Sequence, residues 1–105
     1  MTFIEQRRHE RVSVEIHVYW GWTNDCTLQG RIISISEGGY FLRTEQAAPR
    51  GEPIFIKFWL PEPKTLRGEV RYHLERWGLG AEFVGLSPDE TAALTALVEH
   101  YRQNQ

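Results

Sequence analysis

The sequence is poor in cysteine, in excess basic charge and in long hydrophobic runs, and each shortage excludes a class of protein. Its 105 residues include one cysteine, Cys26, so no internal disulfide can form, and no Cys/His zinc spacing exists. With 12 basic and 14 acidic side chains, the chain lacks the overall basic charge of a general nucleic-acid binder. No apolar stretch approaches the roughly 18 residues of a membrane span, and the first residues become charged before a signal-peptide core could form. We therefore expect a cytoplasmic chain that neither inserts into membranes nor binds nucleic acid polymers.

What is present indicates one globular domain built mainly from strands. A hydrophobic content of 41% over this length supports a single core. Alternating or β-branched and aromatic stretches predict short strands, separated by turns rich in Gly, Pro and Asn. In the strand over 66–72, we expect Leu66, Val70 and Tyr72 to share one face. The predicted fold is mainly all-β, a small antiparallel six-stranded β-barrel. The predicted strands cover residues 12–19, 28–34, 40–44, 54–60, 66–72 and 79–84.

Only the C-terminal part has helical periodicity. Ser87 followed by Pro88 and Glu90 predicts a capping box, with Ser at the N-cap and Pro at the first helical position. Leu94 and Leu97 begin an apolar stripe that continues at helical spacing. We expect this C-terminal α-helix, over residues 87–103, to pack on the barrel. The single domain 1–105 would then comprise a flexible basic arm (1–11), the barrel (12–86) and the helix.

A basic segment precedes the first predicted strand. Arg7, Arg8 and Arg11 place three guanidinium groups within five residues. A guanidinium forms two parallel hydrogen bonds with a phosphate or with the edge of a guanine. The segment could also be a solvated tail without a ligand. As a flexible arm it could fold over a ligand that rests on the barrel.

A second polar segment, Ser34-Ile35-Ser36-Glu37-Gly38-Gly39, follows a predicted strand. The Ser36 hydroxyl can donate to a phosphate oxygen, and Gly38 and Gly39 let backbone N–H groups approach a ligand without an intervening Cβ. Paired glycines also permit a turn with positive φ. In the alternative interpretation, Ser36 only caps the turn.

The order and spacing of these segments resemble the PilZ domain, a bacterial family that binds cyclic di-GMP. Arg7 and Arg11 match its Arg-x-x-x-Arg segment, and Ser36 and Gly39 match its [Asp/Asn]-x-Ser-x-x-Gly segment. A third segment, residues 78–83, resembles the late Gly-x-Gly strand of the same family. The resemblance implies a cyclic di-GMP receptor or adaptor that regulates a partner protein. The ligand-binding residues that it implies are Arg7, Arg8, Arg11, Ser34, Ser36, Gly38 and Gly39.

Ser34 departs from the family pattern, which has Asp or Asn at this position. One neutral hydroxyl in place of a carboxylate predicts binding weakened on the order of tenfold. The rival hypothesis is a degenerate PilZ domain that serves as a protein-interaction module without nucleotide binding. A third, a barrel that binds single-stranded nucleic acid, is disfavoured by the net negative charge.

Four tryptophans and four histidines leave further alternatives open. Core packing is the expected role of the tryptophans, and base stacking by Trp77 or Tyr40 is the alternative. An exposed apolar patch around Trp20 and Trp22 would favour the interaction module. The histidines show no ligand spacing, and no catalytic arrangement is present, so we expect no enzyme, no catalytic or metal site and no cofactor.

Overall fold

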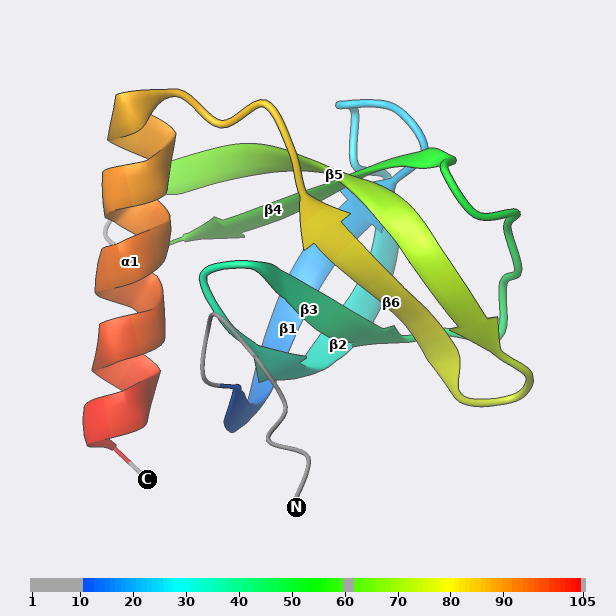
Figure 1. Ribbon diagram of the computed structural model, residues 1–105, viewed down its shortest axis with the longest axis horizontal. Helices are drawn as coiled ribbons and strands as arrows, with labels where there is room; N and C mark the ends of the chain where they lie inside the picture. Colours follow the sequence, from blue (N-terminus) through cyan, green and yellow to red (C-terminus); the bar gives the residue numbers. More distant parts are fainter. Residues whose placement is uncertain (1–10, 60–61, 105) are drawn as a thin grey trace, which may run out of the picture.

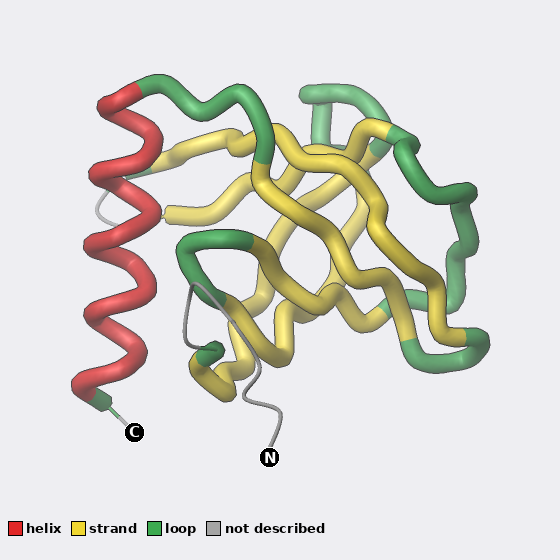
Figure 2. The backbone as a smooth tube through the Cα atoms, in the orientation of Figure 1, coloured by secondary structure: helices red, strands yellow, loops and turns green. Residues whose placement is uncertain are grey.

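The structure is a computed structural model that describes residues 11–59 and 62–104. Its strands close into one antiparallel barrel in the order β1-β2-β3-β6-β5-β4, which confirms the predicted fold. Figure 1 shows α1 alongside this barrel, and Figure 2 shows that loops join the strands at their ends. No helix in the described residues is long and apolar enough to cross a membrane. The elements are β1 (Val12–Gly21), β2 (Leu28–Ile35), β3 (Gly39–Arg43), β4 (Pro53–Trp59), β5 (Pro63–Leu74), β6 (Gly78–Phe83) and α1 (Pro88–Gln103).

The core is filled mainly by aliphatic side chains, together with the rings of Trp20, Tyr40 and Phe58. Trp20 on β1 is almost fully buried, and Trp22 packs on it edge-to-face with ring centroids 5.0 Å apart. An exposed apolar patch at these two residues, which would have favoured the interaction module, is therefore absent. Apolar burial of this kind is the main favourable contribution to folding. The fully buried aliphatic residues include Ile32, Ile35, Leu42, Ile54, Ile56, Leu66, Val70 and Leu79.

The C-terminal helix begins as the sequence predicts. The Ser87 hydroxyl accepts a hydrogen bond from the Glu90 amide at 3.1 Å, and the Glu90 carboxylate accepts one from the Ser87 amide at 2.8 Å. Both bonds satisfy amides that a helix start otherwise leaves without a partner. The apolar stripe buries Leu94, Leu97 and Val98 in the same core cluster as the strands. The helix is therefore part of the core.

Several details differ from the sequence-based expectations. β1 extends to Gly21 and β5 begins at Pro63, because both join ladders with β4. The strand pairing of β5 with β6 shifts register between Val70 and Tyr72. This irregularity turns Tyr72 outward, with 42% of its surface exposed, so the prediction that it shares a face with Val70 was wrong.

The expected division of the chain into arm, barrel and helix stays a prediction, because Arg7, Arg8 and the rest of residues 1–10 lie outside the described residues.

Candidate functional site

The turn between β2 and β3 is held by the Ser36 side chain. Its Oγ accepts hydrogen bonds from the amides of Gly38 at 3.0 Å and Gly39 at 3.2 Å. The Ser36 amide donates to the Gly39 carbonyl at 2.8 Å, which closes the turn. The hydroxyl therefore caps the turn, and its own O–H has no acceptor among the described residues. This donor is the group that a bound anion could accept from.

Neither glycine of this turn has positive φ, and Gly39 instead serves close packing. Positive φ angles occur at other described glycines, Gly51, Gly78 and Gly85, so that expectation for Gly38 and Gly39 was wrong. A Cβ on Gly39 would lie 2.2 Å from the Ala81 carbonyl oxygen of β6. Glycine is required here because β3 and β6 approach each other closely.

The structure places Arg11 beside this corner. Its Nη1 donates to the Ser34 Oγ at 3.1 Å, across 23 positions of sequence. Ser34 pairs with Ser13 on β1 and with Phe41 on β3, and both ladders are irregular next to it. The last residue of the basic segment thus meets the first residue of the polar segment. Arg7 and Arg8 lie outside the described residues.

Ser34 is the first member of a row that crosses four strands on the outer face. Phe41 pairs with Ser34 and with Gly80, and Gly80 pairs with Tyr72. The Phe41 and Tyr72 rings are stacked, with centroids 6.2 Å apart and planes at 29°. A Cβ on Gly80 would lie 2.2 Å from the Tyr72 ring, so only glycine lets this ring lie flat on the sheet. We call Ser34, Phe41, Gly80 and Tyr72 the cross-strand row.

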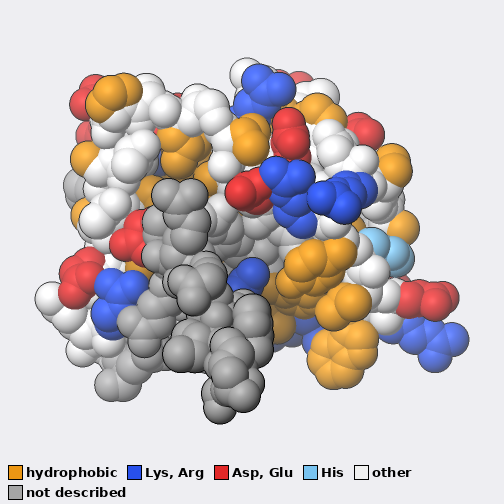
Figure 3. Space-filling view, viewed as in Figure 1, with side chains coloured by type: hydrophobic (Ala, Val, Ile, Leu, Met, Phe, Trp, Pro, Cys, Tyr) orange, Lys and Arg blue, Asp and Glu red, His pale blue; other side chains and the backbone are white. Residues whose placement is uncertain are grey.

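Further aromatic and cationic groups lie near one end of β3 and β6. Trp77 is 59% exposed, and the Arg43 guanidinium lies over its ring at 4.9 Å. Arg43 pairs with Gly78, the residue after Trp77. Figure 3 shows hydrophobic side chains gathered on this face with Lys and Arg side chains close by. An exposed face that combines aromatic rings with guanidinium groups can stack planar bases and hold anions.

The core role expected for the tryptophans fails at two of them, and the alternative of base stacking fails at Tyr40. Tyr40 is fully buried, so it cannot stack on a base. Trp59 and Trp77 are at least half exposed, so the expected core role fails for both. Phe41 and Tyr72 were missed as candidates, because their proximity depends on which strands are neighbours. The signal that could have indicated them is Gly80, a glycine within a strand, where a close approach of another group is a common reason for glycine.

Burial perturbs two titratable groups of the interior. It raises the pKa of the Tyr40 phenol far above its ordinary value, with a smaller contribution from Cys26. Burial also raises the pKa of the Cys26 thiol, which Lys57 partly opposes. Within residues 11–59 and 62–104, no three His, Cys, Asp or Glu side chains form a group that could hold a metal.

Solved structures with the same fold include several that name this family. The inhibitor of motility of Bacillus subtilis (MotI/DgrA) has 18% identity and a TM-score of 0.78, over 97% of this chain and 53% of that one. The PilZ domain of YcgR from Escherichia coli, solved with cyclic di-GMP, has 18% identity and a TM-score of 0.74, over 95% and 94%. The PilZ domain of CeSA from a cellulose-synthesising bacterium has 16% identity and a TM-score of 0.73, over 89% and 98%.

At these identities the similarity shows the fold alone. This chain spans about half the length of the motility inhibitor that it matches. No curated protein matches the sequence. A family model described as the PilZ domain, however, matches residues 5–100, which include the basic segment, the turn and the Gly-x-Gly strand. This chain belongs to the PilZ domain family.

Proposed function

We propose that this protein is a cyclic di-GMP receptor or adaptor that changes its surface on ligand binding and thereby regulates a partner protein. Family membership supports the proposal, and the similar PilZ domain of YcgR was solved with this ligand. We further propose that the protein acts in the cytoplasm. The proposal includes no catalytic step and no cofactor.

The proposed ligand has two phosphodiesters and two purines, and the proposed site residues would supply a matching group for each. Arg7 and Arg11 would bind phosphates and guanine edges, and Arg8 would add charge. The O–H of Ser36, which has no acceptor among the described residues, would donate to a phosphate, and Gly38 and Gly39 would let the ligand approach their backbone. Ser34 would support a base. The exposed Tyr72 ring of the cross-strand row, stacked on the buried Phe41, would supply a stacking surface.

The contact of Arg11 with Ser34 is the observation that carries this proposal. It brings a guanidinium of the basic segment to within 3.1 Å of the strand that leads into the turn. Arg11 is exposed, so its other N–H donors can reach a ligand. Arg11, the described residue of the basic segment, therefore lies beside the strand end that leads into the Ser36 turn.

Calorimetric titration with cyclic di-GMP tests the proposal. We expect saturable binding by the wild type, and Arg7→Ala and Arg11→Ala should each weaken it about tenfold to a hundredfold, the loss typical of a charged hydrogen bond. Arg50→Ala is the matched control, because Arg50 is an exposed arginine in the loop before β4. Absence of heat from the wild type, or equal losses in all three variants, would refute the proposal.

The second candidate is a protein-interaction module that retains the barrel without binding nucleotide. It is favoured by Ser34, and by the hydrogen bonds that already occupy the Gly38 and Gly39 amides. A wild type that gives no heat, together with a partner that co-purifies in stoichiometric amount, would support this candidate. A short single-stranded oligonucleotide should not compete for the site at physiological salt, since a polymer binder would show steep salt dependence.

A further inference from the structure

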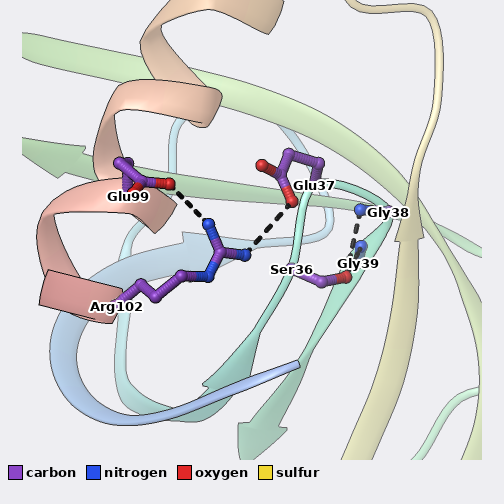
Figure 4. A network of polar contacts seen from close by, with 6 residues as sticks. All are labelled: Ser36, Glu37, Gly38, Gly39, Glu99 and Arg102. Atoms are coloured by element: carbon purple, nitrogen blue, oxygen red, sulfur yellow. Dashed lines mark hydrogen bonds and ion pairs between the residues drawn. The ribbon is translucent and has the colours of Figure 1, made fainter. Parts of the chain in front are cut away.

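An ion pair of Arg102 connects helix α1 to the turn between β2 and β3. Arg102 lies 4.0 Å from the Glu37 carboxylate and donates to Glu99 on its own helix at 2.5 Å. Figure 4 shows the Arg102 side chain between these two carboxylates. The Arg102 and Glu37 side chains are only 31% and 25% exposed, so solvent screens their attraction less than it screens a surface pair.

Glu37 is the acidic residue of the turn, placed between the capping Ser36 and Gly38. Figure 4 shows its carboxylate on the side of the helix, away from the Ser36 hydroxyl. The proposed ligand is a dianion. If the Glu37 carboxylate had no counter-ion, it would repel the phosphates of a ligand bound at this turn. If the carboxylate rotated toward Ser36, it could accept the O–H that we propose donates to the ligand.

The rest of the turn is fixed by bonds that do not involve Glu37. Ser36 binds the two glycine amides, and the Gly38 carbonyl accepts from the Phe83 amide of β6 at 3.0 Å. The orientation of the Glu37 side chain is thus the part of the turn that depends on α1. The contact comes from the last turn of the helix, well away from its cap at Ser87.

We infer that Arg102 is a positioning residue for the ligand site: it neutralises Glu37 and holds that carboxylate away from the Ser36 hydroxyl. The inference rests on the proposed binding of cyclic di-GMP and extends the site to a residue outside the three motifs. Because coupling between two sites is reciprocal, bound ligand should in turn strengthen the contact of the turn with α1.

A double-mutant cycle with Arg102→Met and Glu37→Gln tests this inference. In wild-type background, Arg102→Met should weaken cyclic di-GMP binding roughly threefold to tenfold, the range of a partly screened charge effect. Glu37→Gln should bind as well as wild type or more tightly. In the Glu37→Gln background, Arg102→Met should change the affinity by less than about twofold, since the charge that it controls is gone.

Two controls separate positioning from mere stabilisation of the helix. Glu99→Gln removes the partner of Arg102 within the helix and should leave affinity close to wild type. Arg102→Lys keeps the charge and should recover most of the affinity lost in Arg102→Met. Equal losses for Arg102→Met in both backgrounds, or no loss in either, would overturn the inference.

A measurement without ligand keeps the inference separate from the proposed function. Amide hydrogen exchange of Gly38 and Gly39 reports whether Ser36 still holds the turn. We expect faster exchange in Arg102→Met, because a released Glu37 that accepts the Ser36 O–H can rotate the Oγ away from the two glycine amides, and exchange near the wild-type rate in the double variant. If the wild type does not bind the nucleotide, the proposed function fails, and unchanged exchange in Arg102→Met would then overturn the positioning role as well.

Discussion

Ser34 is the residue at which this chain departs from its family, and the structure gives that departure a physical meaning. Its neutral hydroxyl accepts from Arg11. That bond is charge-assisted through the guanidinium alone, and a carboxylate would add the opposite charge and a second acceptor oxygen, which should strengthen the contact by about 1 kcal/mol or more. We predict that Ser34→Asp tightens cyclic di-GMP binding about tenfold by calorimetry, because a better-ordered Arg11 forms a better site. Ser34→Ala is the control and should weaken binding. Weaker binding by Ser34→Asp than by wild type would contradict this account.

Tyr40 carries a buried hydroxyl that has no hydrogen-bond partner among the described residues. Its pKa is raised above the ordinary value of 10.0, so the folded state retains the phenol proton more strongly than the unfolded state does. This contribution to stability is complete below pH 10 and is lost as pH rises beyond it.

We therefore predict two effects of Tyr40→Phe. The variant should be as stable as wild type near neutral pH, or more stable by up to about 1 kcal/mol, because it removes an unpaired buried polar group. Its stability should also fall less steeply than that of wild type above pH 10. Urea unfolding at a series of pH values measures both effects, and Tyr101→Phe, on the half-buried helix face, is the control. Parallel pH profiles for Tyr40→Phe and wild type would contradict the prediction.

Several residues could be assigned from sequence, and others could not. The capping box was predictable because its bonds are local, between residues three positions apart. The cap that Ser36 forms on its turn was foreseen as an alternative for the same reason. The neighbours of Trp59, Trp77 and Tyr40 depend on the whole barrel, and here the sequence-based assignments were wrong.

At the scale of the elements, β5 and β6 meet through a glycine. We predict that Gly80→Ala destabilises the fold by about 1–3 kcal/mol, because the new methyl group would displace the Tyr72 ring that now lies 2.2 Å from its position. The same displacement should weaken ligand binding if the ring is a stacking surface. Urea unfolding and calorimetry measure the two effects.

A second substitution tests the cause. In a Tyr72→Ala background, the methyl group of Gly80→Ala meets no ring, so its cost should fall well below the cost in wild type. Gly21→Ala provides a comparison, since its nearest contact would be a less severe 3.3 Å. Additive costs of Gly80→Ala and Tyr72→Ala would show that the strain lies elsewhere.

The approximate positions of the six strands and the helix could be predicted from hydrophobic periodicity, turn residues and the capping box. The register shifts within the strands could not be predicted in this way. The register shift that exposes Tyr72 inserts one residue into a ladder. Its location is set by how β5 curves to close the barrel, and nothing in a single strand's own pattern encodes that curvature. If a prediction relies on alternation alone, it therefore assigns the residues that follow a bulge to the wrong face of the sheet.

At the scale of the molecule, the closed barrel was predicted but its strand order was not. β3 pairs with β6, and the late strand thereby lies beside the turn. That pairing supplies the Phe83 bond to Gly38 and stacks Phe41 on Tyr72. The candidate site is thus built from three regions that are far apart in sequence, and one pairing of strands brings two of them together.

The helix and the barrel share one core, so we predict that they unfold together. Ser87→Ala removes the side chain that accepts from the Glu90 amide, and should lower the free energy of unfolding of the whole domain by about 1 kcal/mol.

All four tryptophans lie outside α1, so their fluorescence reports the barrel, while circular dichroism at 222 nm reports the helix. Since Leu94 and Leu97 are buried against the strands, the two signals should shift together in urea by the same amount. Ser87→Asp retains a capping oxygen and should unfold close to wild type. Loss of the helical signal ahead of the fluorescence transition in Ser87→Ala would instead make α1 a separable element, which could detach while the barrel stays folded.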